Sequence, residues 1–176
     1  KRRLVFEEFL VLQLGLLHMK SGRSAENLHP VPEGFPEAFA QLLPFALTGA
    51  QRRAITQAIG DMAGPAPMNR LIQGDVGSGK TAVAAALCWA AAQQGYQAAL
   101  MAPTEILAQQ HFASLSALLG PGGVRCALFT GSMPLAQRRE QQARLAAGEI
   151  QLAIGTHALL SEKVAFRDLG LVITDE

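Results

Sequence analysis

The amino-acid sequence predicts an α/β protein built on a mostly parallel sheet with helices on both faces. From residue 70 onward, short apolar runs of strand length alternate with longer helical runs. Parallel strands need long crossover connections, and helices of this length supply them. A glycine-rich segment, GDVGSGKT, lies between the first apolar run and the first long helical run. Hydrophobic residues make up 49% of the chain and charged residues 16%, which indicates a packed core and excludes a disordered chain.

The individual elements follow from local signals. Thr48 is a typical N-cap residue, and the helix after it is expected to run to about residue 62, where the sequence AGPAPMN ends it. The expected strands cover residues 70–73, 97–102, 125–130, 151–156 and 169–176. The expected helices between them cover residues 79–94, 105–119 and 135–147.

The first 35 residues predict a linker helix and a connector that precede the main domain. Apolar residues recur at helical spacing over residues 2–20, and four prolines follow between residues 30 and 44. We expect a boundary at residue 35, a short helix over residues 36–43, and one domain over residues 36–176. Because the chain begins without methionine and stops at a strand-like run, we expect it to be a fragment of a longer protein.

Charge and composition narrow the class of protein further. Residues 1–23 carry five basic and two acidic side chains, and the rest carries two more acidic than basic ones, so a nucleic acid must be held by placed groups. Glu7 and Glu8 interrupt the apolar opening, and the longest apolar run is too short to cross a bilayer, so we expect no membrane partner. Cys88 and Cys126 lie in apolar runs without metal-binding spacing, which favours a reducing cytoplasmic compartment.

The segment GDVGSGKT has the spacing of a phosphate-binding loop, G-x-x-x-x-G-K-[ST], between a predicted strand and a predicted helix. Its glycines let successive N–H groups turn around a phosphate, and the following helix adds the positive end of its dipole. We expect Lys80 to reach the β- and γ-phosphates of ATP and the hydroxyl of Thr81 to ligate Mg²⁺. A chance glycine-rich turn is the alternative. The expected nucleotide-binding residues of the loop are Gly74, Asp75, Val76, Gly77, Ser78, Gly79, Lys80 and Thr81.

The apolar run LVITDE ends in two acids, Asp175 and Glu176. In a P-loop fold the first acid at this place holds Mg²⁺, commonly through water, and a second acid can orient or deprotonate the attacking water. An exposed acidic turn is the alternative. The adjacent pair favours hydrolysis over binding alone and over a kinase. The expected catalytic residues are therefore Lys80, Asp175 and Glu176, and the expected metal ligands are Thr81 and Asp175.

Small polar residues follow three of the predicted strands, where helices or turns begin. Thr104 is a helix-cap residue, but the N–H groups of a helix start can also meet a phosphate of bound nucleic acid. Three such turns at the carboxyl edge of one sheet predict a nucleic-acid track. As a single residue, His157 is more often structural than catalytic. The expected DNA-binding residues are Pro103, Thr104, Glu105, Thr130, Gly131, Ser132, Gly155, Thr156 and His157.

Two residues upstream of the loop are candidates for the nucleotide base. Phe45 can stack or pack near a base, and Gln51 can hydrogen-bond an adenine edge, although a helical glutamine is usually solvated. The arginine- and glutamine-rich run over residues 136–145 predicts a solvated helix face more than a DNA contact.

The chain resembles superfamily 2 helicases and translocases, and among them the RecG family of bacterial ATP-dependent DNA helicases. The resemblance covers most of the chain, from about residue 47 to residue 176. It rests on LTGAQRRAITQAIGDM, PMNRLIQGDVGSGKTAVAAAL, ALMAPTEILAQQHF, LFTGS, GEIQLAIGTHALL and LGLVITDE, in that order. Transcription-repair coupling factors have a similar motor, but Ser78 and Glu105 favour the RecG family.

The resemblance implies a RecA-like first motor domain whose ATP hydrolysis drives translocation on duplex DNA at stalled forks and Holliday junctions. It implies that Gln51 senses adenine, that residues 103–105, 130–132 and 155–157 contact DNA, and that residues 175–176 form motif II. Expected partners are branched double-stranded DNA and single-stranded DNA-binding protein, and a monomer associated with the nucleoid is expected. The second motor domain would follow residue 176, so this chain alone is expected to bind nucleotide weakly and to turn over negligibly. A polymerase-displacing coupling factor and a non-enzymatic P-loop regulator are the alternatives.

Overall fold

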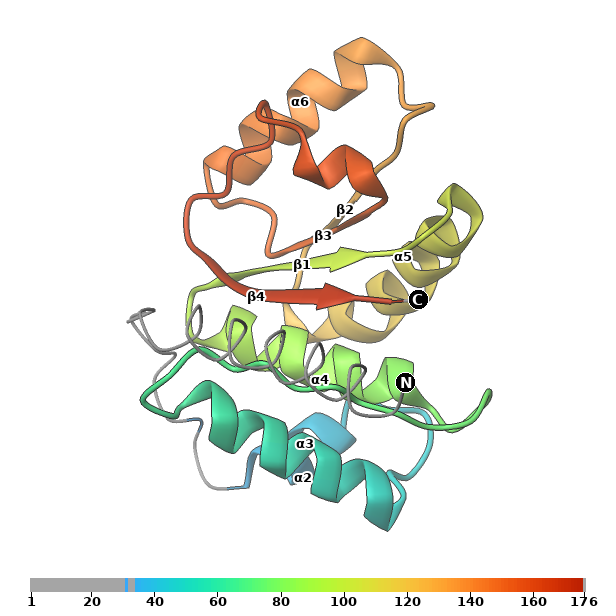
Figure 1. The fold of residues 1–176 in the computed structure, drawn as a ribbon, viewed down its shortest axis with the longest axis vertical. Coiled ribbons are helices and arrows are strands. Elements are labelled where there is room, and N and C mark those ends of the chain that lie inside the picture. The colour runs from blue at the N-terminus through green and yellow to red at the C-terminus, as the bar shows by residue number, and fades with distance from the viewer. Residues whose placement is uncertain (1–30, 32–33, 176) are drawn as a thin grey trace, which may run out of the picture.

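The computed structural model describes Val31 and residues 34–175 (Figure 1). The expected helix over residues 2–20 and most of the expected connector lie outside the described residues. Four parallel strands form one sheet in the order β2-β3-β1-β4. The strands are β1 (Gln97–Met101), β2 (Cys126–Phe129), β3 (Leu152–Gly155) and β4 (Leu169–Thr174). These four expected strands and their parallel arrangement are confirmed.

The helices also follow the sequence signals closely. They are α2 (Phe35–Ala40), α3 (Gly49–Met62), α4 (Lys80–Gln93), α5 (Glu105–Leu119) and α6 (Leu135–Ala146), with short 3₁₀ turns η1 (Gly120–Gly122) and η2 (His157–Leu160). Thr48 caps α3 and Thr104 caps α5, each accepting a hydrogen bond from a backbone N–H of the first turn. Both caps were predicted from residue type.

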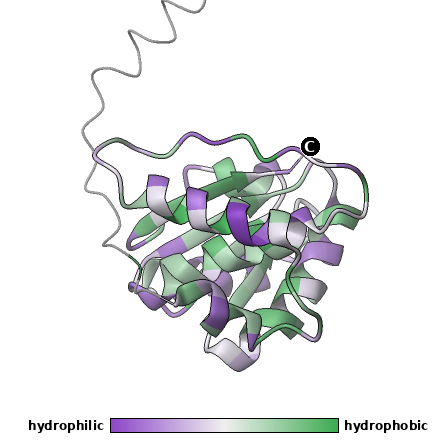
Figure 2. Cartoon of the chain, turned by 90° about the horizontal axis from the view of Figure 1, so that it is seen from below, coloured by the Kyte–Doolittle hydropathy of each residue, from purple (hydrophilic) through white to green (hydrophobic). Residues whose placement is uncertain are grey.

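The sheet is covered on two faces by different sets of helices. On one face, Leu100 of β1 and Ile154 of β3 belong to the core that α4 and α5 complete, with α3 and α2 stacked beyond α4. On the other face, Phe129 of β2 packs with Leu145 of α6 and Leu159 of η2. Figure 2 shows hydrophobic strands in the interior and hydrophilic residues on outer helical turns. The expected α/β layering is confirmed over β1, β2 and β3.

The expected strand over residues 70–73 is absent, which corrects the sequence-based prediction. Its backbone forms no ladder in the structure, and the Leu71 side chain is 82% exposed. Arg70 instead donates hydrogen bonds to Asp61 (Nε–Oδ2, 2.5 Å) and to Gln57 (Nη1–Oε1, 3.3 Å), so the segment runs along α3. β4 is thereby an edge strand, and Val172 on its outer face is 59% exposed.

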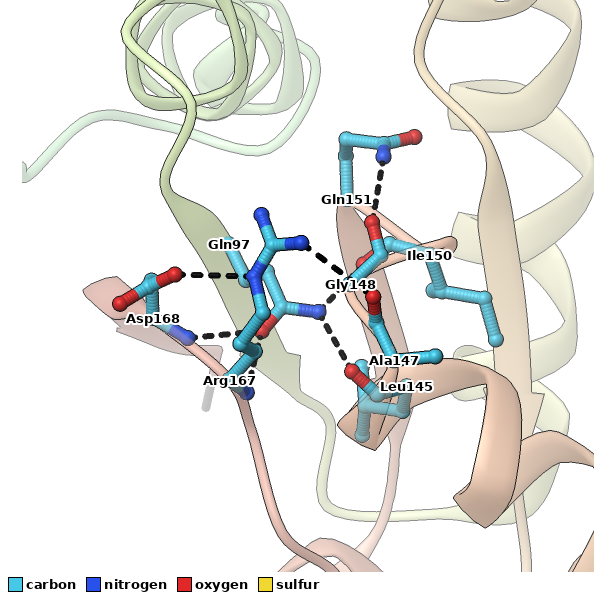
Figure 3. A network of polar contacts seen from close by, with 8 residues as sticks. All are labelled: Gln97, Leu145, Ala147, Gly148, Ile150, Gln151, Arg167 and Asp168. Atoms are coloured by element: carbon cyan, nitrogen blue, oxygen red, sulfur yellow. Dashed lines mark hydrogen bonds and ion pairs between the residues drawn. The ribbon is translucent and has the colours of Figure 1, made fainter.

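A buried amide fixes the segment that leads into β4 (Figure 3). Gln97, 2% exposed, donates from Nε2 to the carbonyl oxygens of Leu145 (2.9 Å) and Ile150 (2.6 Å). Its Oε1 accepts from the backbone N–H groups of Arg167 (2.7 Å) and Asp168 (3.1 Å). One side chain thus joins the end of α6, the start of β3 and the entry to β4, and every hydrogen-bonding atom of the amide is used.

Both cysteines are free, as the sequence predicted, and burial raises the pKa of the Cys88 thiol to about 12. A cysteine in this environment is a small apolar core residue. Within Val31 and residues 34–175, no helix is long and apolar enough to cross a membrane.

Candidate active site

The predicted phosphate-binding loop joins Gln73 to the first residue of α4. Gly77 and Gly79 have φ angles of +81° and +80°, which side chains with a Cβ rarely adopt. A Cβ on Gly74 would lie 2.7 Å from Oγ of Ser78 and 3.3 Å from its Cβ, so a larger residue there would require the Ser78 side chain to move. Val76 at the tip is fully exposed. The backbone therefore forms the curved loop that the motif requires.

Lys80 folds back over this loop. Its Nζ donates to the carbonyl oxygens of Gly74 (2.7 Å) and Asp75 (3.1 Å), so the charge lies inside the curve of the backbone. The N-terminal end of α4 adds its dipole at the same place. A lysine and a helix start that converge on one loop are suited to a polyphosphate.

Gln51 links α3 to the loop. Its Oε1 accepts from the Thr48 N–H (2.9 Å) while the Thr48 hydroxyl accepts from the Gln51 N–H (3.2 Å), which completes a capping box. Its Nε2 donates to the carbonyl oxygen of Ser78 (3.0 Å). The alternative of a solvated glutamine does not hold, because both ends of this amide are engaged and one of them bonds the phosphate loop. The adenine contact of Gln51 stays a prediction.

A groove of about 700 Å³ lies beside the loop. Phe45, 51% exposed, lines it together with Gly79 and Thr81 of the loop and with residues of α5. The apolar wall beside a polar loop suits a base next to its phosphates. The structure thus places Phe45, Gly79 and Thr81 on one groove, and the packing of Phe45 against a base stays a prediction.

Asp175 follows the carboxyl end of β4, and α4 begins near the same end of the strands (Figure 1). Its backbone N–H donates to the carbonyl oxygen of Met101 (2.8 Å), so its position is fixed to the end of β1. Its Oδ2 lies 2.7 Å from Nε2 of His111 on α5. Glu176 lies outside the described residues.

The three predicted strand-end turns lie along one edge of the sheet, after β1, β2 and β3 (Figure 1). The first two are joined by Glu105, whose carboxylate accepts from the hydroxyl of Ser132 (2.6 Å) and from its N–H (3.1 Å). These hydrogen bonds hold the pKa of Glu105 below its usual value. A negative charge here would repel a phosphate of DNA. We therefore interpret the Glu105 carboxylate as a group that organises the turn, and not as a direct contact to DNA.

The nine residues expected to contact DNA differ in accessibility. Thr130 and Gly155 are buried, so a phosphate contact at these two residues would have to come from the backbone. A Cβ on Gly155 would collide with the carbonyl oxygen of Phe129. The close approach of β2 and β3 at this point therefore requires glycine. Thr156 is half-buried. The exposed members are Pro103, Thr104, Gly131, Ser132 and His157.

Two further residues belong to this site and were missed by sequence reasoning. His111 lies between Ala108 and Leu115 on the buried face of α5, and a polar residue on such a face was the available signal. Arg138 was expected on a solvated helix face. It instead donates from Nη2 to the carbonyl oxygens of Thr130 (2.9 Å) and Gly131 (2.8 Å) and so supports the second turn.

Among the described residues, no group of three or more His, Cys, Asp and Glu side chains could hold a metal ion. Magnesium does not require such a group, because it usually retains several waters and takes one or two protein ligands besides a phosphate. A threonine hydroxyl beside the phosphate loop and a carboxylate at the end of β4 fit that donor set.

Comparisons with known proteins agree on the class of this chain. The sequence model of the DEAD/DEAH box helicase family matches residues 48–176. The chain is 49% identical over 179 residues to the ATP-dependent DNA helicase RecG of Synechocystis and 50% identical over 182 residues to that of Bacillus subtilis, with all of this chain aligned. The chain spans 22% and 26% of the length of these two relatives. The predicted resemblance to RecG helicases is confirmed.

Solved structures show the same relationship. A RecG bound to a three-way DNA junction matches with a TM-score of 0.87 and 39% identity, covering 99% of this chain and 24% of that one. A hypothetical ATP-dependent RNA helicase from Sulfolobus tokodaii matches with a TM-score of 0.59 and 20% identity, over 82% of this chain and 41% of that one. The second match supports the predicted RecA-like fold alone.

Proposed function

The chain belongs to the DEAD/DEAH box helicase family, and we propose that it is the first motor domain of a DNA helicase that acts on branched DNA. The observation that carries this proposal is that Asp175 and the three strand-end turns lie at one edge of one sheet, while the phosphate loop begins the helix α4 that packs on β1 and β4 of the same sheet. We infer that ATP hydrolysis and DNA contact are coupled through this edge. The similarity to a RecG bound to a three-way junction supports branched DNA as the substrate.

In this proposal Lys80 leaves the carbonyl oxygens of Gly74 and Asp75 and binds the β- and γ-phosphates of ATP. Thr81 and Asp175 would hold Mg²⁺, which would neutralise charge at the phosphates when bound. Glu176 orients the attacking water. Phe45 packs against the base in the groove, and Gln51 exchanges its hydrogen bond to Ser78 for the adenine edge, which makes the loop responsive to adenine.

DNA is held by placed polar groups. The N–H groups at the start of α5 that have no partner within the helix meet a phosphate of the DNA, with the hydroxyl of Thr104 beside them. The turns after β2 and β3 contribute their exposed residues Gly131, Ser132 and His157. Glu105 and Arg138 keep the second turn in place. We assign residues 1–35 to a linker from a preceding domain and residues 36–176 to the motor domain. We further propose that the full-length protein is a cytoplasmic, nucleoid-associated monomer, with single-stranded DNA-binding protein as a partner.

The test is ATPase and unwinding by the full-length protein on a model fork, a Holliday junction and linear duplex of equal length. We expect stimulation by the two branched substrates to exceed that by linear duplex, and we expect the matched Lys80→Ala variant to be inactive on all three. An ATPase indifferent to DNA together with no fork unwinding would contradict the proposal. Displacement of a stalled RNA polymerase without fork unwinding would instead identify a transcription-repair coupling factor.

The isolated 176-residue chain provides a second measurement. We expect weak nucleotide binding and negligible turnover, because groups from the second motor domain complete the site. Robust DNA-stimulated hydrolysis by this chain alone would show that its own residues suffice.

A further inference from the structure

His111 and Asp175 form a hydrogen bond between α5 and the end of β4 that no motif of the sequence accounts for. The Nε2–Oδ2 distance is 2.7 Å, and the histidine side chain is 16% exposed against 40% for the aspartate. An ionised carboxylate can only accept hydrogen bonds, so Nε2 carries the hydrogen and donates it. Hydrogen bonds to ionised acceptors are short and stronger than neutral ones, which agrees with this distance.

The hydrogen bond from His111 restrains the side chain of Asp175, whose backbone is held by a separate contact. Its backbone is already tied to Met101 by a 2.8 Å hydrogen bond at the end of β1. That bond sets the position of the Cα but leaves the side-chain torsions free. The donor from His111 restrains the carboxylate and engages one of its two oxygens. A metal ligand restrained in this way keeps its orientation between binding events.

The helix that carries His111 also carries the start of the DNA track. Thr104 caps α5, and Glu105, its first residue, holds Ser132. His111 follows Glu105 by six residues, a rise of about 9 Å along the helix. A rigid helix therefore touches the strand-end turns with its first turn and the carboxylate of Asp175 two turns later. A shift of α5 on binding a phosphate backbone would move both contacts together.

We propose that His111 is a positioning residue that orients the Asp175 carboxylate for magnesium-dependent nucleotide binding and transmits the position of α5 to it. This inference rests on the proposed function, since it takes Asp175 as a magnesium ligand. His111 does not touch nucleotide or metal. It acts through Asp175 alone, and its effect is confined to what depends on magnesium.

The first test measures the affinity of the full-length protein for a fluorescent ATP analogue with and without Mg²⁺. We expect His111→Ala to weaken the magnesium-dependent affinity about tenfold, as loss of an outer hydrogen bond to a metal ligand typically does. Affinity in EDTA should change less than about twofold, because the phosphate loop is intact. His111→Gln, whose amide can donate to the same oxygen, should recover most of the loss. Gln110→Ala, an exposed position on the same helix, is the matched control and should match wild type.

The second test measures how far fork DNA raises kcat above its value without DNA. We expect this ratio to fall in His111→Ala and to recover in His111→Gln, with unchanged thermal unfolding in both. Equal weakening with and without Mg²⁺, or a glutamine variant no better than alanine, would overturn the inference and leave a packing role only. If His111→Ala does not fold, the comparison of His111→Gln with wild type tests the inference. The inference requires that the nucleotide affinity of His111→Gln still depends on Mg²⁺. A wild-type protein without DNA-stimulated ATPase refutes the proposed function instead, so the two failures are distinct.

Discussion

Glu105 and Ser132, 27 residues apart in the sequence, are joined by two hydrogen bonds of 2.6 and 3.1 Å that tie the start of α5 to the turn after β2. The carboxylate is the acceptor in both, and Arg138 supports the same turn from its other side by donating to the carbonyl oxygens of Thr130 and Gly131. The start of α5 and the turn after β2, two segments of the proposed DNA track, are therefore held in a fixed relative position by the Glu105 carboxylate.

This link predicts a pH-dependent stability. The pKa of Glu105 lies below its ordinary value of 4.5, first because of the Ser132 hydroxyl. The stabilisation is therefore complete above pH 4.5 and is lost as the pH falls through the lower pKa of the folded state. We expect the urea midpoint of Glu105→Gln to lie below that of wild type at pH 7 and the two to converge in acid. Ser132→Ala, which keeps the backbone donor, should show a smaller difference with the same trend.

The contact between Glu105 and Ser132 also predicts how DNA affinity changes when the carboxylate is removed, and the predicted direction is opposite to that expected from charge alone. Replacing Glu105 with alanine removes a negative charge near the phosphate track, which by electrostatics alone would tighten DNA binding. Because the turn loses its support, we expect Glu105→Ala to weaken fork binding by roughly 2–10-fold, the range of one to two hydrogen bonds. Fluorescence anisotropy at several salt concentrations measures this. Tighter binding by the variant would show that the carboxylate only repels DNA.

Gln51 and Thr48 allow helix capping to be separated from loop support. Each is half of the capping box, so either alanine variant should cost about 1 kcal/mol of unfolding free energy. Only Gln51→Ala also removes the amide that bonds Ser78 without nucleotide and that the proposed function assigns to the adenine edge when ATP binds. We therefore expect Gln51→Ala to raise the KM for ATP about 2–10-fold and Thr48→Ala to leave it unchanged. Equal KM values in the two variants would assign Gln51 to capping alone.

Gln97 predicts a large stability effect at a site far from the loop. Gln97→Leu leaves the carbonyl oxygens of Leu145 and Ile150 and the N–H groups of Arg167 and Asp168 without their buried partner. We expect a loss of roughly 3–5 kcal/mol in urea unfolding, because each orphaned group adds a desolvation cost. Gln93→Leu, at an exposed position with one 3.4 Å bond to Gly122, is the matched control and should change stability by less than about 0.5 kcal/mol.

Two glycines predict opposite effects of the same added methyl group. Gly155→Ala should cost about 2 kcal/mol or more, because the new Cβ meets the backbone of Phe129, which cannot move without breaking the β2–β3 pairing. Gly60, inside α3, has nothing within 4 Å of an added Cβ. Gly60→Ala should stabilise by roughly 0.5–1 kcal/mol through helix propensity. Thermal unfolding of the two variants checks both signs in one experiment.

Local signals predicted the parts of this fold that depend on a few neighbouring residues. The caps at Thr48 and Thr104, the phosphate loop and four of the strands all follow from residue types within one turn or one run. The apolar residues Leu71 and Ile72 predicted a fifth strand by the same reasoning. A strand also needs an edge to pair with, and Arg70 holds this segment to α3 instead.

The contacts that organise the site were not predictable in this way. Gln97 reaches partners 48 to 71 residues away, and His111 lies 64 residues from Asp175. Nothing in the spacing of such residues specifies that they meet, because their meeting depends on the order of strands in the sheet. Arg138 was misassigned for the same reason, since its partners Thr130 and Gly131 are reached only once the turn after β2 has formed.

The strand order β2-β3-β1-β4 has a consequence for how the chain folds during synthesis. Among the described strands, β2 and β3 alone are neighbours both in the sheet and in the sequence, and no strand pairing of this sheet can form before β3 is made. β1 is synthesised before the other described strands yet pairs with β3 and β4, so it has no strand partner until β3 has been made. Its apolar residues stay exposed during that interval, which makes the nascent domain dependent on α4 and α5 or on chaperones for protection.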